Sequence, residues 1–164
     1  MGTEAMFGQL LTGGIVSFIN FGIHAAMTGL IVLATRQTAE LTDHLNVFAR
    51  LTALLTIAVT VLMFAHVVEV AVWTIFYHEA GVTPASGARA FEFAFENYTA
   101  LGYGDAVPSP DKRLYGPITA LNGLLLIGWS VAVIFEVMRM AEVQIARDDE
   151  PKTPSAKRNR KRQG

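Results

Sequence analysis

The sequence predicts an all-α membrane protein with three membrane-spanning helices and a short re-entrant segment between the second and third. Three observations support this fold class. Charged residues make up 16% of the 164 residues, against roughly 25% in a soluble domain. The chain contains three long apolar runs, and the stretch between the last two is too polar to cross a membrane.

Each apolar run is long enough to span a bilayer, for which about 20 residues suffice. No Asp, Glu, Lys or Arg occurs in residues 5–35, so we expect an N-terminal transmembrane helix within residues 1–36. The second run, residues 51–77, is interrupted only by His66 and Glu69. The third, residues 114–135, carries no charge.

The net charge of −1 hides an uneven distribution of basic residues. Ten of the 13 flank the first connection or follow the third run, and three lie on the other side. The positive-inside rule therefore predicts a cytoplasmic C-terminus and an external N-terminus. Residues 147–164 are rich in Lys and Arg, and we expect a disordered tail that binds anionic lipid or only sets topology. The body lacks the basic footprint of a nucleic-acid binder, and the absence of cysteine excludes thiolate chemistry.

A short helix is expected over residues 87–99, where Phe91, Phe95 and Tyr98 are spaced by four and three. Twelve helical residues extend about 18 Å, which is half a membrane. Glycine-rich chain follows at 102–105. Irregular backbone at membrane depth is tolerated only where protein buries it or water lines it, so this region is predicted to be a re-entrant loop.

The segment Thr99-Ala100-Leu101-Gly102-Tyr103-Gly104-Asp105 resembles the selectivity-filter signature of potassium channels. Such a sequence suits cation binding, because backbone carbonyl oxygens can replace the water around a dehydrated ion. Glycine permits the left-handed backbone that turns successive carbonyls inward. The helix before the segment would direct the negative end of its dipole toward the ion.

The resemblance extends over residues 51–142, and the pattern His66-x-x-Glu69 with Gly128-Trp129-Ser130 is similar to small bacterial channels of the two-pore-domain type with one pore loop per chain. It implies a pore domain over residues 47–146. Its parts would be an outer helix at 50–78, a pore helix at 87–99, a filter at 100–105 and an inner helix at 115–146.

The resemblance implies passive potassium conduction in a multi-pass protein of the cell membrane, expected to be a bacterial inner membrane. One loop cannot surround an ion, so a homotetramer in the lipid bilayer is expected. No catalysis and no cofactor is expected beyond potassium ions, held by Thr99, Ala100, Leu101, Gly102, Tyr103 and Gly104. Ala100 replaces the family's threonine and Leu101 its valine, which leaves a weakly selective monovalent cation channel as an alternative.

Further expectations concern residues around the filter. Glu96 and Asp105, nine residues apart, match a carboxylate pair behind the filter that shares a proton or water. Gly123 is either the hinge of the inner helix or a packing glycine. Ser130 shares its helical face and is expected to line the cavity, with Thr119, Val133 and Val137. Glu136 either forms an acidic ring at the pore mouth or pairs with Arg139.

Three ionisable residues are expected near mid-membrane, namely His24, His66 and Glu69. They form a proton-sensing or metal-binding cluster, or Glu69 pairs with His66 for structural reasons. One face of the first span carries small and polar residues, and we expect this face to pack against other helices of the protein. Its residues are Gly13, Ser17, Asn20, His24 and Thr28. Two other classes of function are an intramembrane His/Glu metal-binding protein or enzyme, and a non-conducting auxiliary subunit.

Overall fold

The computed structural model describes residues 2–41, 46–83, 87–102 and 107–148. These residues form four α-helices and no strand, which confirms the predicted all-α membrane fold. The helices are α1 (Thr3–Leu41), α2 (Val47–Glu79), α3 (Gly87–Tyr98) and α4 (Tyr115–Asp148). The expected filter residues Tyr103, Gly104 and Asp105, and the tail from residue 149, lie outside the described residues.

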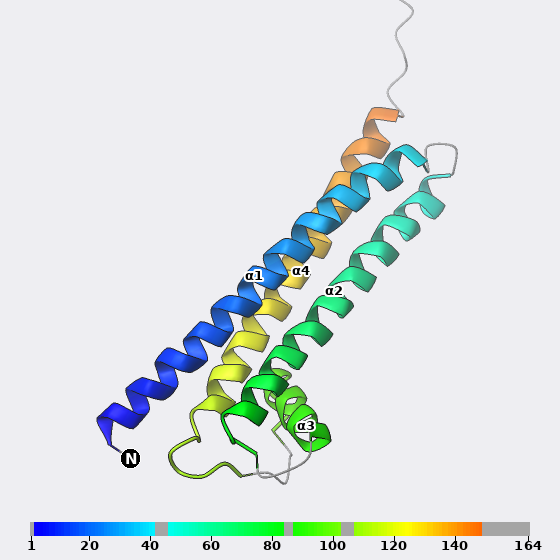
Figure 1. Ribbon diagram of the computed structural model, residues 1–164. Coiled ribbons are helices and arrows are strands. Elements are labelled where there is room, and N and C mark those ends of the chain that lie inside the picture. The colour runs from blue at the N-terminus through cyan, green and yellow to red at the C-terminus, as the bar shows by residue number, and fades with distance from the viewer. Residues whose placement is uncertain (1, 42–45, 84–86, 103–106, 149–164) are drawn as a thin grey trace, which may run out of the picture.

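Helices α1, α2 and α4 run side by side along the long axis of the molecule, and the short α3 lies beside one end of them (Figure 1). Segments of 33, 33 and 29 residues within the three long helices are long and apolar enough to cross a membrane. The chain therefore has the architecture of a multi-pass membrane protein in a lipid bilayer. The N-terminus of α1 and the start of α4 lie at the same end as α3 (Figure 1).

Local signals in the sequence explain where α2 begins and ends. The Asn46 side chain accepts a hydrogen bond of 2.9 Å from the amide of Ala49, which satisfies one of the free N–H groups at the helix start. At the other end, the Lys112 ammonium group donates to the carbonyls of Ala80 and Gly81 at 2.7 and 2.8 Å. This cation neutralises the negative end of the helix dipole and ties the connection before α4 to the end of α2.

That connection also carries an ionised acid outside the spans. A hydrogen bond from Ser109 is the main cause of a lowered pKa at Asp111, helped by the residue's own backbone and by the charge of Lys112. The carboxylate is therefore charged at neutral pH. Position 111 is fully solvent-exposed.

The core consists of two clusters of buried apolar side chains at different levels of the bundle. One joins α2 to α3 and the start of α4 around Trp73, Tyr77 and Tyr98. The other joins all three long helices around Ile31, Leu54, Leu62, Val133 and Val137. The polar face expected on α1 points into the protein, with Asn20 and His24 fully buried, so the packing prediction is confirmed.

The short helix α3 has one face toward the bundle and one away from it. Ala90, Ala94 and Tyr98 are buried. Phe91 and Phe95 are about half exposed, and their rings stack with centroids 6.0 Å apart. The spacing of four and three had grouped these rings with Tyr98, but the structure separates Tyr98 from them. Tyr98 turns toward α2 because buried polar partners lie there.

Candidate pore loop and the polar network behind it

Helix α3 ends in a left-handed turn that places the loop residues. The amide of Leu101 bonds the carbonyl of Glu96, and the amide of Ala100 bonds that of Asn97, both at 2.9 Å. This double pattern is the Schellman motif, in which the residue after the cap adopts a positive φ. Ala100 has φ 56° although glycine is the usual residue there. Gly102 also has a positive φ, 69°, as the motif analysis required.

Residues 99–102, here called the loop segment, are exposed in the single chain. Among the described residues, none donates a hydrogen bond to their carbonyl oxygens. The Thr99 hydroxyl instead bonds back to the carbonyl of Phe95 at 2.9 Å. The loop segment therefore presents backbone acceptors at the C-terminal, negative end of α3, which is the arrangement that attracts a cation.

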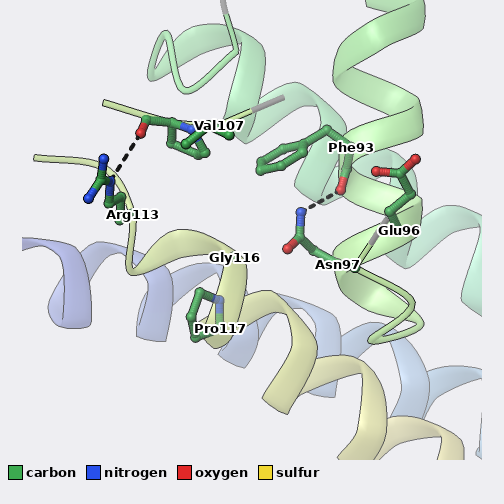
Figure 2. A pocket seen from close by; sticks show the side chains of 9 residues that line it. Phe93, Glu96, Asn97, Val107, Arg113, Gly116 and Pro117 are labelled. Carbon is green, nitrogen blue, oxygen red and sulfur yellow. Dashed lines mark hydrogen bonds between the residues drawn. The ribbon is translucent and has the colours of Figure 1, made fainter. Parts of the chain in front are cut away.

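A pocket of about 280 Å³ lies between α3, the connection before α4 and the first turn of α4 (Figure 2). Glu96 and Arg113 line it together with Phe93, Asn97, Gly102, Val107, Pro108, Gly116 and Pro117. The Asn97 amide donates to the carbonyl of Phe93 at 2.7 Å. Glu96 thus lies beside the loop as expected, and the predicted pairing with Asp105 lies outside the described residues.

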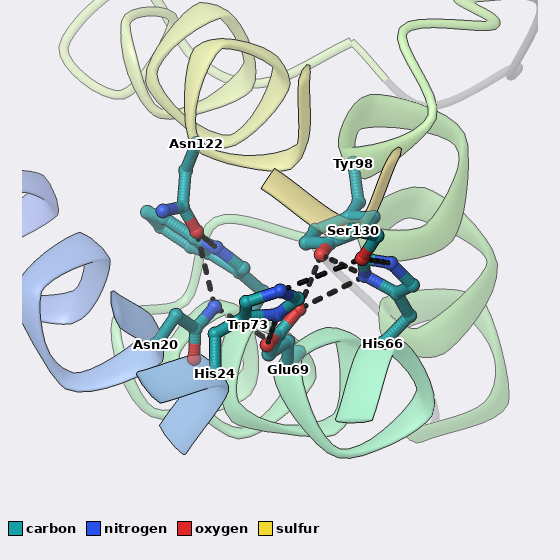
Figure 3. A network of polar contacts seen from close by, with 8 residues as sticks. All are labelled: Asn20, His24, His66, Glu69, Trp73, Tyr98, Asn122 and Ser130. Carbon is teal, nitrogen blue, oxygen red and sulfur yellow. Dashed lines mark hydrogen bonds and ion pairs between the residues drawn. The ribbon is translucent and has the colours of Figure 1, made fainter. Parts of the chain in front are cut away.

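Behind α3, eight side chains from all four helices form a buried polar network (Figure 3). Its members are Asn20, His24, His66, Glu69, Trp73, Tyr98, Asn122 and Ser130. Glu69 is the hub. Its carboxylate lies 2.9 Å from His24 Nδ1 and 3.1 Å from His66 Nδ1, and it accepts a hydrogen bond from the Tyr98 hydroxyl.

The two imidazole rings share a second partner on the opposite side. His66 Nε2 lies 2.9 Å and His24 Nε2 lies 3.4 Å from the hydroxyl oxygen of Ser130. His66 Nδ1 is also 2.7 Å from the Tyr98 hydroxyl. Glu69, His66 and Tyr98 are thus mutually bonded, and His24 and Ser130 close the group into a ring.

A second branch of the network holds α1, α2 and α4 together through Asn122. Its side-chain oxygen accepts from Asn20 at 3.1 Å and from the indole N–H of Trp73 at 2.9 Å. Asn20 also donates to the backbone carbonyl of Glu69 at 3.3 Å. All three side chains are at most 2% exposed. Because an unpaired buried donor is costly, this branch specifies how the three helices pack.

The network shows how deep α3 reaches. His24, His66 and Ser130 lie near the middle of α1, α2 and α4. Tyr98, the last residue of α3, bonds directly to His66 and Glu69. A helix of 12 residues that starts at one end of the bundle therefore ends at the level of mid-span. This is the geometry of a re-entrant helix.

Gly123 lies where α4 crosses the end of α3. A Cβ atom at this position would overlap the backbone carbonyl oxygen of Tyr98. Gly116 makes a second close approach, since a Cβ there would lie 2.8 Å from the side-chain oxygen of Asn97. Of the two alternatives for Gly123, the structure supplies a packing role, because only a residue without a side chain permits this contact between helices.

The residues predicted to line a cavity are buried within the single chain. Ser130 bonds the two histidines, and Thr119 bonds Tyr77. Val133 and Val137 belong to the core cluster with α1 and α2. The face that carries Gly123 therefore points into the bundle of the single chain, where these residues pack between helices. The cavity lining stays a prediction for the assembled protein.

The remaining predicted site residues have local partners. Glu136 forms a two-contact ion pair with Arg139, at 2.7 and 2.9 Å. An ion pair with Arg139 on the same helix was one of two alternatives for Glu136, and the structure contains this ion pair. His24, His66 and Glu69 are brought together as expected.

Three members of the network were not predicted from the sequence, namely Trp73, Tyr98 and Asn122. A signal was present, because a Trp, Tyr or Asn side chain buried in an apolar helix needs a hydrogen-bond partner.

Residues 63–140 match the family model described as Ion channel. The matched segment runs from the middle of α2 through α3 and the loop segment to most of α4. No curated protein and no solved structure matches the chain. The chain is therefore similar to the ion channel family over residues 63–140, within a multi-pass membrane architecture. The match points to a channel.

Proposed function

We propose that the protein is a potassium channel that conducts passively through a pore formed by four copies of the chain. The observation that carries this proposal is the end of α3 at mid-span, followed by the exposed residues 99–102, which open the sequence Thr-Ala-Leu-Gly-Tyr-Gly-Asp. In such a pore the carbonyls of residues 100–103 replace the water around each ion. The C-terminal dipole of α3 adds about half a negative charge per chain at this level.

Geometry supports the proposal of several chains around one pore, and the resemblance to potassium channels sets their number at four. One loop supplies oxygens on one side of an ion only, so a ring of carbonyls needs several chains. The face of α3 with Phe91 and Phe95 and the face of α4 with Leu121, Leu124 and Leu125 are exposed in the single chain. They supply apolar surface for neighbouring copies and for lipid. The orientation with an external N-terminus and a cytoplasmic, lipid-binding tail belongs to the same proposal.

A second candidate is a monovalent cation channel of weak selectivity. Position 100 carries an alanine with a positive φ, so no side-chain hydroxyl is available for the innermost ion. A filter with one site fewer would discriminate less between potassium and sodium.

Ion flux from liposomes tests the proposal. Purified protein in vesicles with a potassium gradient should give a flux that barium blocks, and sodium should replace potassium poorly. Equal sodium and potassium flux would favour the weakly selective channel. Absence of flux for every monovalent cation, over a range of pH, would contradict both and support an auxiliary subunit. Cross-linking in detergent should stop at four chains.

A further inference from the structure

The centre of the polar network has the composition of a metal site. The ligand atoms of His24, His66 and Glu69 all lie within 4.8 Å of one another. His24 and Glu69 are fully buried, and the His66 side chain is 17% exposed, which leaves one side of the group open to an entering ion. The Tyr98 hydroxyl contacts both His66 and Glu69 and supplies a fourth donor atom (Figure 3).

The orientation of the two rings favours a cation between them. Both turn Nδ1 toward Glu69 and Nε2 toward the single hydroxyl oxygen of Ser130. A hydroxyl has two lone pairs, so Ser130 can accept an Nε2–H from each ring. Tyr98 donates its hydrogen to Glu69, so His66 Nδ1 is the donor toward the Tyr98 oxygen and the carboxylate. A cation that takes both Nδ1 lone pairs would therefore require the Nε2–H tautomer of each ring, which Ser130 is placed to accept.

The charge of Glu69 gives an independent reason. Its side chain is 0% exposed near the middle of a spanning helix, where a carboxylate requires a positive partner. In the described part of the chain, its ion-pair partners are the two histidines and include no Lys or Arg. A bound divalent cation compensates this charge and leaves both imidazoles neutral.

We propose that His24 Nδ1, His66 Nδ1 and the Glu69 carboxylate, with the Tyr98 hydroxyl as fourth ligand, bind one divalent transition-metal ion of the zinc class per chain. Two imidazole nitrogens select such ions over magnesium, calcium or potassium, which prefer oxygen. Ligand atoms around a tetrahedral zinc ion lie roughly 3.3 Å apart. Three of the present separations are 2.7 to 3.1 Å, with His24 at one carboxylate oxygen of Glu69 and His66 at the other, and all the His and Glu ligand atoms lie within 4.8 Å of one another. Binding of one ion would require side-chain shifts that bring the ligand atoms to a common centre. Ser130 then holds both rings in the required tautomer.

The site would act on the proposed pore through Tyr98. This residue ends α3 and is directly followed by the loop segment. When the ion binds, the neutral Tyr98 hydroxyl would coordinate through an oxygen lone pair and keep its proton, and its position relative to Glu69 would change. The position of the loop segment then depends on whether the ion is present. This regulatory step rests on the proposed function, whereas the metal site does not.

Metal binding is tested on the full-length chain, tag-free, in detergent and first stripped with a chelator. Cobalt(II) added to the stripped protein should give the visible absorption of a tetrahedral site, saturate at one ion per chain and be displaced by zinc. His66→Gln and Glu69→Gln should abolish saturation. His78→Gln, an exposed histidine at the end of α2, is the matched control and should behave as the unaltered protein.

Two milder variants keep the test valid if removal of a ligand prevents folding. Ser130→Ala retains all ligands and should weaken cobalt binding about 10–100-fold, because the rings lose their common partner. Tyr98→Phe should retain one ion per chain but shift the absorption spectrum, since water replaces the phenol. Circular dichroism and gel filtration establish that each variant is folded.

The proposal is overturned if cobalt does not saturate at one ion per chain, or if Ser130→Ala and His66→Gln bind it as His78→Gln does. Potassium flux separates this result from the proposed function. Flux in the presence of chelator supports the channel whatever the binding result. Zinc should change the flux of the unaltered protein and of His78→Gln, and leave that of His66→Gln unchanged; zinc acting equally on all three would contradict the regulatory step.

Discussion

The two sides of the short helix α3 differ in how far one chain satisfies its polar groups. Behind α3, the side chains of the polar network find partners on all four helices of the same chain. In front of it, the carbonyl oxygens of the loop segment are exposed and receive no hydrogen bond from any described residue. The helix is therefore supported from within the chain and left open on the side where its loop begins.

This difference separates stability from function. The network has two buried side-chain atoms without a hydrogen-bond partner, Asn20 Oδ1 and Asn122 Nδ2. Its other buried polar groups are paired and specify one arrangement of helices, so substitutions in the network should act mainly on folding. Oxygens without partners contribute little to the fold of one chain, so substitutions in the loop segment should act mainly on conduction. Substitutions on each side of α3 test whether this division is correct.

The largest effect is expected in the loop segment, with Gly102→Ala. Gly102 has φ 69°, and an alanine there must either accept strain or turn the carbonyl away. We expect potassium flux to fall to the background of empty liposomes, while the unfolding free energy in detergent falls by only roughly 1 kcal/mol, the cost of an alanine in the left-handed region. Gly22→Ala, at an exposed glycine of α1 with no atom within 4 Å of its would-be Cβ, is the control. Normal flux in Gly102→Ala would refute the filter assignment.

Gly123→Ala should have the largest effect on stability. Its Cβ would overlap the carbonyl of Tyr98, and backbone atoms cannot move aside as a side chain end can. We expect a loss of about 3 kcal/mol or more, measured as reduced thermal and denaturant resistance in detergent. Gly128→Ala, where nothing lies within 4 Å in the single chain, serves as comparison. A stable Gly123→Ala protein with altered channel opening would instead support the hinge alternative.

Removal of the Asn122 side chain tests the second branch of the network. Asn122→Ala leaves the buried N–H groups of Asn20 and Trp73 without their acceptor. Each orphaned donor costs 1–3 kcal/mol, and relaxation recovers part of this, so we expect a loss of about 2 kcal/mol in unfolding free energy. The tryptophan fluorescence should also shift as Trp73 changes partner. A loss below about 0.5 kcal/mol would show that the branch is not part of the stabilising core.

A smaller change in the opposite direction is expected for Ala100→Gly. Glycine removes the penalty of the left-handed conformation at the end of α3. The variant should be more stable by roughly 1 kcal/mol, whereas Ala100→Thr, with a β-branched side chain, should be less stable than the unaltered protein. The comparison of the two melting temperatures checks the backbone conformation. A more stable threonine variant would show that residue 100 is extended in the assembled pore.

The smallest effect is expected for Glu136→Gln. Glu136 and Arg139 are both well exposed and pair with each other, so the acid contributes little net field at the pore mouth. Single-channel potassium conductance at low ionic strength should be unchanged within error, and so should the melting temperature. A clear fall in conductance would favour the acidic-ring alternative over the helix pair.

Features that depend on residues close together in the sequence could be predicted, and features that depend on residues far apart in the sequence could not. Three spans follow from apolar length alone, and the short helix follows from its phenylalanine spacing and the glycines after it. The group of His24, His66 and Glu69 was expected because ionisable residues at mid-span need partners. These are inferences from composition and from neighbours a few positions apart.

Interactions between distant positions were not predictable in the same way. Tyr98 bonds Glu69 from 29 residues away, and Ser130 bonds His24 from 106 residues away. A helical wheel shows that Ser130 shares a face with Gly123, but it does not show whether that face meets water or another helix. The position of Gly123 against a backbone carbonyl depends on the crossing of α3 and α4, which no local pattern encodes.

The contact at Gly123 also limits where the inner helix can move. Because the backbones of α4 and α3 touch there, a movement of α4 at this residue would have to carry the end of α3 with it or break the contact. In the proposed pore, a swing of α4 that leaves the loop segment undisturbed would therefore start beyond position 123, toward the end that carries Glu136.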